Sequence, residues 1–332
     1  AIDSYEKAIQ IKPNYAEAYG NLGNALSELG QLEKAIESYD KVIQIRPNYA
    51  EAYINRGVAL QKLMHLEEAI ESYEKAIQIK PNSAEAHSNR GNALKDLKQM
   101  DRALESYNHA VALNPNIDFI SGAFLYTKMH LCLWDDFEKD IILLIKKIKT
   151  GKKASTPFPM LALIDDPEIQ RKTAEIYING KYPQTHILLK NIACYPNHKK
   201  IKIGYFSADF HNHATMHLMA ELFECHDKTK FEIIAFSFGP EHKDEWRKRA
   251  FLSFDQFIDV RLRTDRDIAF LAKEMEVDIA VDLKGFTKYS RPGIFAEGCA
   301  SIQVNYLGYP GTMAAEFMDY LIADRVLIPT AQ

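Results

Sequence analysis

Prolines recur along the first third of the chain at a constant spacing of 34 residues, at Pro13, Pro47, Pro81 and Pro115. A period of this length, kept three times in succession, is typical of solenoids, in which short structural units stack on one another. Other positions keep the same spacing: Gly23, Gly57 and Gly91; Leu26, Leu60 and Leu94; Ala1, Ala35, Ala69 and Ala103; Tyr5, Tyr39, Tyr73 and Tyr107. The first part of the chain is therefore predicted to be an array of similar units.

The residue types at these positions predict two helices in each unit. Glycines let the first helix approach its neighbour, and alanines in the second leave space for tyrosine and leucine side chains. Each proline ends the second helix because it has no N–H donor and clashes with the preceding turn. An asparagine follows each proline and suits the turn to the next helix. The pattern resembles the tetratricopeptide repeat, so residues 1–117 are expected to form an α-solenoid of about three complete repeats and a partial one.

One asparagine in each complete repeat stands two residues before the glycine: Asn21, Asn55 and Asn89. These side chains are expected to form a ladder along the inner helices. A side-chain amide offers both a donor and an acceptor, which matches the two polar groups of a peptide unit. The ladder is therefore suited to hold an extended polypeptide by its backbone. The alternative interpretation is that these are merely solvated polar positions.

Residues 119–149 continue a helical pattern and are expected to cap the solenoid. The apolar stripe consists of Phe124, Trp134, Phe137, Ile141 and Leu144. The lysines at the end of this segment, Lys146, Lys147 and Lys149, are interpreted as a solvated helix C-terminus, where the helix dipole favours cations.

The segment from Gly151 to Pro159 interrupts the periodicity and indicates a linker. Asp165 and Asp166 are expected to cap a helix that starts at Pro167, a residue suited to the first helical position. Residues 118–200 are thus predicted to form a helical cap and linker.

From Ile201 onward, short apolar runs alternate with amphipathic segments, which is typical of a parallel sheet with helices on both faces. The predicted strands are 201–207, 231–238, 256–260, 278–283, 302–307 and 320–323. Residues 201–332 are therefore expected to form one Rossmann-like α/β lobe. In such sheets ligands bind beyond the carboxyl ends of the strands, so the loops that follow the strands are the candidate sites.

The loop after the first predicted strand holds three histidines: His211, His213 and His217. His213 is the candidate for contact with a reacting group, because it lies in the loop at the strand end. His217 falls within the following helix and is expected to pack or hydrogen-bond, and His211 is expected to be solvated. No carboxylate or thiol ligands stand elsewhere at suitable spacing, so no metal site is predicted.

Two further loops follow predicted strands. Residues 284–291 combine Gly285 with cations and hydroxyls, which favours a pyrophosphate or acceptor site that includes Lys288, although a solvated basic loop is an alternative. The glycines and proline of Leu307, Gly308, Tyr309, Pro310, Gly311 and Thr312 predict a tight turn that a ligand can approach, or a purely structural turn. A GxGxxG sequence is absent, which disfavours a complete dinucleotide site.

Composition limits the partners. A net charge of −4 and a pI near 6.3 argue against a nucleic-acid binder. No apolar run reaches the roughly 20 residues that span a bilayer, so no membrane partner is expected. The four cysteines, which form no CxxC pair, are predicted to be reduced, buried thiols of a cytoplasmic protein: Cys132, Cys194, Cys225 and Cys299. The chain begins within a repeat and stops after a predicted strand, so we expect a piece of a longer protein.

The stretches GYFSADFHNHATMHL (204–218), GFTK (285–288), LGYPGT (307–312) and FMDYLIAD (317–324) resemble the O-linked N-acetylglucosamine transferase family, including its SPINDLY-like members. The resemblance covers nearly the whole chain and implies the first half of a two-lobed glycosyltransferase fold, without the second lobe. It implies that His213 contacts sugar and acceptor, that residues 307–312 close over the donor, and that the asparagine ladder grips the acceptor backbone.

The resemblance also implies an activity. The enzyme would transfer N-acetylglucosamine from its UDP donor to Ser or Thr of intracellular proteins. The reaction would invert the sugar configuration and need neither a metal nor a cofactor. The repeats could also form a homo-oligomer. In animal members a histidine precedes the strand aligned with 278–283, and no histidine stands there in this chain. The identity of the transferred sugar therefore stays open, and O-fucosylation and N-glucosylation are alternatives. A non-catalytic repeat scaffold is the alternative of another class. Residues 1–332 alone are expected to be inactive.

Overall fold

The structure is a computed structural model that describes residues 1–182, 199–326 and 328. The chain separates into two compact units, Ala1–Ile169 and Gln170–Gln332. None of the described helices is long and apolar enough to cross a membrane.

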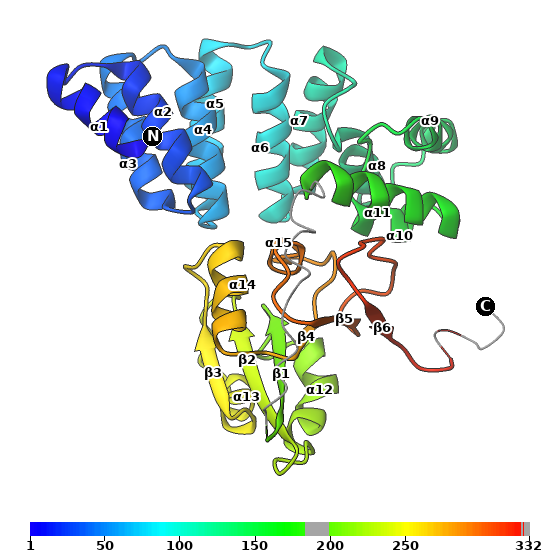
Figure 1. Ribbon diagram of the computed structural model, residues 1–332. Helices are drawn as coiled ribbons and strands as arrows, with labels where there is room; N and C mark the ends of the chain where they lie inside the picture. The colour runs from blue at the N-terminus through cyan, green and yellow to red at the C-terminus, as the bar shows by residue number, and fades with distance from the viewer. Residues whose placement is uncertain (183–198, 327, 329–332) are drawn as a thin grey trace. The chain divides into compact units, whose positions relative to one another are not determined.

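Helices of the repeats stack side by side in the first unit (Figure 1). They are α1 (Ile2–Ile11), α2 (Ala16–Glu28), α3 (Leu32–Ile45), α4 (Ala50–Lys62), α5 (Leu66–Ile79), α6 (Ala84–Asp96) and α7 (Met100–Leu113). The second helix of each repeat, α3, α5 or α7, ends two residues before the repeating proline, and so does α1. The predicted role of proline as the end of that helix is therefore confirmed, and α1 is the second helix of a partial repeat.

The repeating glycine and tyrosine form the same contact in all three complete repeats. A Cβ atom added at Gly57 would lie 2.5 Å from Cε1 of Tyr73, and Gly23 and Gly91 face Tyr39 and Tyr107 in the same way. The tyrosine hydroxyl then donates to a side chain of the first helix: to Oδ1 of Asn24 or Asn92, or to Oε1 of Gln61. Only glycine leaves room for the ring, so the predicted close approach is confirmed.

The cap over residues 119–149 is helical, as predicted, but it is not one continuous helix. It consists of α8 (Ile120–His130) and α9 (Phe137–Lys149), joined by a turn in which Cys132 and Asp136 have positive φ values of 54°. The apolar stripe is therefore interrupted. Trp134 lies in the turn, where it is 57% exposed and meets only the edge of the Phe137 ring. Periodicity could not show this break, because Trp134 occupies a position that a continuous helix would bury.

The predicted linker from Gly151 to Pro159 is packed against the cap. The N–H groups of Phe119 and Gly122 donate to the carbonyls of Lys153 and Ala154, and α10 (Pro157–Leu163) begins inside this segment. Residues 152–156 have no regular structure, as predicted for a linker, but they also satisfy backbone groups at the start of α8. The predicted cap at Asp166 is confirmed, since its Oδ1 accepts from two N–H groups at the start of α11 (Pro167–Lys181).

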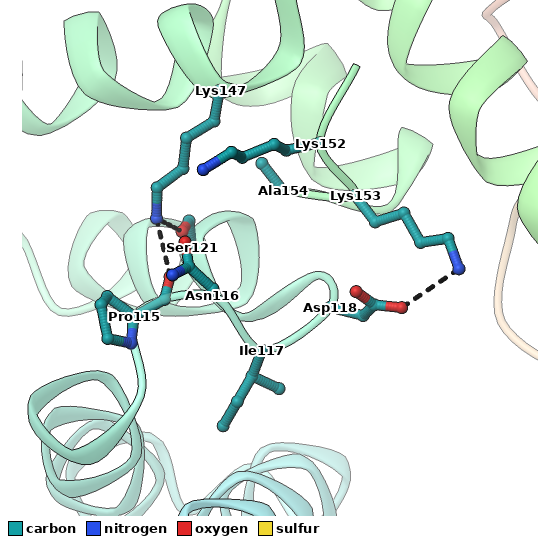
Figure 2. Close-up of a pocket in the computed structure, with 9 residues that line it drawn as sticks. All are labelled: Pro115, Asn116, Ile117, Asp118, Ser121, Lys147, Lys152, Lys153 and Ala154. Carbon is teal, nitrogen blue, oxygen red and sulfur yellow. Dashed lines mark hydrogen bonds and ion pairs between the residues drawn. The ribbon is translucent and has the colours of Figure 1, made fainter. Parts of the chain in front are cut away.

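Lys147 does not belong to a solvated helix end. Its Nζ donates to the carbonyl of Pro115, at 2.8 Å, and to Oγ of Ser121, at 2.9 Å (Figure 2). Figure 2 also shows Lys153 in an ion pair with Asp118. Burial, followed by the nearby Lys152 charge, lowers the pKa of Lys147. This lysine therefore fixes the chain that leaves α7, whereas Lys146 and Lys149 are exposed as predicted.

A parallel sheet forms the second unit. Its strands are β1 (Ile201–Ser207), β2 (Phe231–Ser237), β3 (Gln256–Asp259), β4 (Ile279–Asp282), β5 (Ile302–Tyr306) and β6 (Tyr320–Ile322), in the order β3-β2-β1-β4-β5-β6. The other helices are α12 (Ala214–Glu224), α13 (Glu245–Ser253), α14 (Asp265–Glu274) and α15 (Gly293–Ala296). Each predicted strand agrees with the structure to within one residue at either end.

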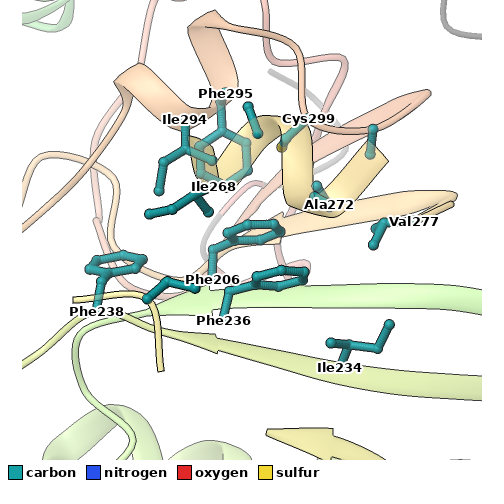
Figure 3. Close-up of a cluster of buried hydrophobic side chains, with 14 of the residues drawn as sticks. Phe206, Ile234, Phe236, Phe238, Ile268, Ala272, Val277, Ile294, Phe295 and Cys299 are labelled. Carbon is teal, nitrogen blue, oxygen red and sulfur yellow. The ribbon is translucent and has the colours of Figure 1, made fainter. Parts of the chain in front are cut away.

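Alternating side chains of the strands fill two cores. Phe206 and Phe236, whose rings stack at 4.4 Å, point to the face covered by α14 and α15 (Figure 3). Their neighbours Tyr205 and Ala235 point to the opposite face, against α12 and α13. Because both faces of the sheet centre are covered, β1, β2 and β4 carry nearly continuous buried runs, which is why the sequence predicted them well.

The cysteine prediction holds only in part. Cys299 is buried, but Cys132 and Cys225 are exposed, because they lie in the turn after α8 and at the end of α12. All three are free thiols. Cys194 lies outside the described residues.

Candidate active site at the carboxyl edge of the sheet

The strand order reverses direction at one point. From β1 the chain adds β2 and β3 on one side, and then returns to place β4 on the other side of β1. The loops after β1 and β4 therefore leave the sheet in opposite directions and open a crevice between them, the usual ligand site of such folds. Residues that follow these two strands are the candidates for the site.

A buried ion pair joins these two loops. Nζ of Lys284, after β4, lies 2.5 Å from Oδ2 of Asp209, after β1. The two residues are only 3% and 5% exposed. A charge pair withdrawn from water in this way is stable only while both partners are present, so each fixes the position of the other. Sequence reasoning missed the pair because its members stand 75 residues apart.

Asp282 at the end of β4 holds the loop that carries Lys284. Its two oxygens accept from the N–H groups of Lys284, at 2.8 Å, and Gly285, at 3.0 Å, and from Nδ2 of Asn305, at 3.3 Å. Burial raises the pKa of Asp282 to about 6, although these hydrogen bonds and the Lys284 charge act in the opposite direction. Oδ1 of Asn305 is buried and finds no hydrogen-bond partner among the described residues. A polar residue closing an apolar strand was the available signal for this network.

His213 lies at the start of α12, beside the ion pair. Its Nδ1 accepts a hydrogen bond from the N–H of Thr215 at 3.2 Å and lies 3.6 Å from Oδ2 of Asp209. Because Nδ1 accepts, the proton of the neutral ring is assigned to Nε2. The side chain is 43% exposed. His213 therefore serves as the helix cap and offers an N–H donor rather than a free lone pair.

The other two histidines of this loop have different roles. The His217 ring stacks on Trp246 at 4.2 Å and its Nε2 shares a hydrogen bond with Oδ1 of Asn212, so the packing prediction is confirmed. The prediction for His211 was wrong: its ring is half-buried and stacks on His242 at 3.9 Å. Burial, followed by the His242 ring, lowers the pKa of His211.

Sequence reasoning also missed a group of three side chains with metal-ligand atoms. His211, His242 and Asp244 bring their ligand atoms within 4.8 Å of one another. Sequence spacing did not reveal them because His242 and Asp244 belong to the loop after β2 and reach His211 only through the folded sheet. The signal in the sequence was the His-Lys-Asp run that follows a strand.

The loop 307–312 packs on the start of the loop 284–291. A Cβ atom at Gly308 would collide with the carbonyl of Leu283, and one at Gly285, where φ is +52°, would collide with Tyr309. Tyr309 is buried against the edge of Phe286, which in turn meets Tyr177 of α11. Of the predicted donor residues, Gly308 and Tyr309 thus hold the two loops together.

The remaining predicted donor residues lie nearer the surface. Pro310 and Thr312 are exposed and Gly311 is half-buried. Lys288 is exposed, and its Nζ lies 5.0 Å from the centre of the Tyr289 ring.

The predicted ladder residues lie on the first helices of the repeats. The successive first helices α2, α4 and α6 contact one another directly. Nδ2 of Asn55 donates to Oδ1 of Asn24 at 3.2 Å. Asn21 is exposed and Asn89 is half-buried.

Comparison with known proteins agrees with this architecture. The sequence profile of glycosyl transferase family 41 matches residues 172–332, and tetratricopeptide-repeat profiles match 4–37, 23–63, 65–98 and 84–117. The probable UDP-N-acetylglucosamine–peptide N-acetylglucosaminyltransferase SEC of Arabidopsis thaliana is 32% identical over 219 residues, which cover 62% of this chain and 22% of that protein. The UDP-N-acetylglucosamine–peptide N-acetylglucosaminyltransferase of Caenorhabditis elegans is 30% identical over 216 residues, which cover 60% of this chain and 18% of that protein.

A solved structure shares the fold. The O-GlcNAc transferase of Thermobaculum terrenum, solved as a point mutant, superposes on this chain with a TM-score of 0.56 at 22% identity. The superposed region includes 95% of this chain and 55% of the Thermobaculum chain. The chain spans only about a fifth of the length of the two curated relatives. The superposition with the Thermobaculum protein extends over both the repeats and the parallel sheet of this chain. Residues 172–332 therefore match glycosyl transferase family 41, after an array of tetratricopeptide repeats, and the chain is similar to the O-linked N-acetylglucosamine transferase and SPINDLY-like proteins.

Proposed function

We propose that the protein containing this chain transfers a sugar from a nucleoside diphosphate donor to Ser or Thr hydroxyls of intracellular proteins. The observation that carries the proposal is a group of polar side chains in the family 41 lobe, at the point where the strand order reverses: Asp209, His213, Asp282 and Lys284. The same chain also carries a repeat array. The names of the relatives support N-acetylglucosamine from its UDP donor as the transferred sugar.

His213 is the proposed contact with the reacting groups. Its Nε2–H can donate to an oxygen of the sugar or of the departing diphosphate, while the Asp209–Lys284 pair fixes the loops on both sides. If the ring also moves a proton, that step is worth about 10²–10⁴-fold in rate. The donor is proposed to lie against Gly308, Tyr309, Pro310, Gly311 and Thr312, with Lys288 near its phosphates.

The proposed reaction inverts the sugar configuration and needs neither a metal nor a cofactor. Backbone N–H groups at the start of α12 and nearby cations can stabilise the departing diphosphate, because a helix N-terminus carries a partial positive charge. The asparagines of the repeat array, Asn21, Asn55 and Asn89, are proposed to hold the acceptor polypeptide. The second catalytic lobe expected from the family would complete the donor site, so the 1–332 chain alone should not transfer sugar.

The first test uses the full-length protein. An acceptor protein is incubated with UDP-N-acetylglucosamine, GDP-fucose or UDP-glucose, with and without EDTA, and is analysed by mass spectrometry. The proposal expects N-acetylhexosamine on Ser or Thr, undiminished by EDTA. Modification by fucose or glucose instead would show that the enzyme uses another donor. No modification with any of the three donors would favour a non-catalytic repeat scaffold.

The second test separates the two roles of His213. His213→Ala removes both the helix cap and the Nε2–H, whereas His213→Asn keeps an oxygen that can cap α12. Both variants of the full-length protein should lose turnover by about 10²-fold or more, with little change in donor affinity. Normal turnover in His213→Asn would show that the residue acts only as a cap.

A further inference from the structure

A second group of polar side chains lies beside His213 at the same edge of the sheet. The loop after β1 contributes His211, and the loop after β2 contributes His242 and Asp244. The two imidazole rings stack at 3.9 Å with 25° between their planes, and the His211 ring lies 5.7 Å from the His213 ring. The proposed sugar transfer uses none of these three residues.

Backbone hydrogen bonds fix the carboxylate in this group. Oδ2 of Asp244 accepts from the N–H of Asn212 at 3.1 Å, and Oδ1 accepts from the N–H of Arg247 at 2.8 Å. Asn212 follows His211 directly, so the first bond ties the two loops together. Each carboxylate oxygen keeps a second lone pair for another partner.

We propose that His211, His242 and Asp244 bind one divalent transition-metal ion, of the class of Zn²⁺, Co²⁺ or Ni²⁺. Two imidazole nitrogens and one carboxylate oxygen form a ligand set that these ions accept, whereas Mg²⁺ and Ca²⁺ prefer oxygen ligands alone. All ligand atoms lie within 4.8 Å of one another.

Binding requires a small closure of the group. Zinc bonds to nitrogen and carboxylate oxygen are about 2.0–2.2 Å long, so two ligand atoms of one ion lie at most about 4.4 Å apart. In the proposed site the two half-buried rings turn from their stacked arrangement to close this difference, and water completes the coordination. The nearby histidines are already engaged: Nδ1 of His213 caps α12, and the His217 ring stacks on Trp246.

An ion held in this way would join the loops after β1 and β2. Because it binds the folded state, it would raise the stability of the sheet unit by an amount that grows with the logarithm of the ion concentration above Kd. This site is distinct from the proposed reaction, which requires no metal, and its test does not depend on sugar transfer.

The test is calorimetric titration of the untagged, metal-free 1–332 chain with ZnCl₂ and with MgCl₂. We expect one Zn²⁺ per chain and no heat with Mg²⁺. His211→Gln, His242→Gln and Asp244→Asn should each weaken Zn²⁺ binding by at least about tenfold, since even outer-shell partners of a metal contribute about 10–100-fold. Asp244→Asn keeps a side chain that can cap α13, so its loss of affinity would not reflect unfolding.

The matched control is His65→Gln. His65 is an exposed histidine whose Nδ1 lies 3.6 Å from Oε1 of Glu68, a surface pair of the kind that binds metal weakly and without specificity. Zn²⁺ affinity should be unchanged in this variant. The proposal fails if the control loses as much affinity as His211→Gln, if Mg²⁺ binds as Zn²⁺ does, or if no stoichiometric binding is seen.

Discussion

The repeat array and the sheet unit are stabilised in different ways. In the array one apolar contact, a tyrosine ring against a glycine, is used three times by residues only 16 positions apart. In the sheet unit a single group of buried charges, from loops far apart in the sequence, holds the candidate site. Local repetition spreads the stability over many equivalent contacts, whereas the polar group concentrates it at one point.

The two tryptophans allow each unit to be followed separately. Trp134 belongs to the first unit and Trp246 to the second. Trp134→Phe removes a side chain that is mostly exposed, so in that background the fluorescence of Trp246 reports the unfolding of the sheet unit.

The largest effect is expected from breaking the buried ion pair. Lys284→Ala leaves the Asp209 carboxylate buried without its partner and should destabilise the sheet unit by about 3–5 kcal/mol. Urea unfolding followed by Trp246 fluorescence measures this loss.

The control for this variant is an exposed ion pair of the same unit, Lys230–Asp227, for which Lys230→Ala should cost no more than about 1 kcal/mol. A double variant, Asp209→Asn with Lys284→Met, should recover part of the stability because no unpaired charge stays buried. Equal losses in Lys284→Ala and Lys230→Ala would remove the contrast between the units.

The next effect is a pH dependence confined to the sheet unit. Since burial raises the pKa of Asp282 to about 6, the folded state favours the protonated carboxyl. Protonated Asp282 therefore stabilises the folded state by at most about 3 kcal/mol. This stabilisation is complete below the unfolded-state pKa of about 3.9 and is lost as the pH rises through about 6.

Urea unfolding at several pH values should therefore show the wild type losing stability relative to Asp282→Asn between pH 4 and pH 6.5. Asparagine has nearly the same shape but no such titration, so the difference isolates Asp282. Parallel pH profiles for the two proteins would contradict the assignment.

A smaller effect is expected from a single repeat contact. Gly57→Ala places a Cβ atom 2.5 Å from Cε1 of the buried Tyr73 and should cost about 1–3 kcal/mol through overpacking. Gly20→Ala is the matched control: its Cβ would meet only Cγ2 of Val42, at 3.9 Å, and alanine favours the helix by about 1 kcal/mol. The measurement is unfolding of the first unit by Trp134 fluorescence, and destabilisation by both variants would sink the idea that the glycine–tyrosine contact matters.

The smallest stability effect is expected at the asparagines of the first helices. Asn55→Ala removes one hydrogen bond, to Asn24, and should cost less than about 1 kcal/mol, whereas Asn21→Ala should cost almost nothing. If these residues hold the acceptor backbone, replacing Asn21, Asn55 and Asn89 together in the full-length enzyme should lower kcat/KM for a long polypeptide acceptor by about tenfold. A short peptide that reaches only the active site is the control, and an equal fall for both would show that the effect arises elsewhere.

The sequence by itself determined the repeating helices and the strands. Helix-ending prolines, the glycine and tyrosine positions and the apolar runs act on neighbours within one repeat or one strand, and such local patterns are visible in a single sequence. The strand boundaries therefore agree with the structure to within one residue. The same local view failed where a turn interrupts a pattern, as it does at Trp134 between α8 and α9.

Only the tertiary structure decided which polar residues meet. The return of β4 to the free side of β1 brings Lys284 to Asp209, and the pairing of β1 with β2 brings His242 and Asp244 to His211. His213 was predicted from its place after a strand, but its role as a helix cap depends on the orientation of the ring. These contacts depend on the order of strands in the sheet, which hydrogen bonds between distant segments determine and local periodicity does not encode.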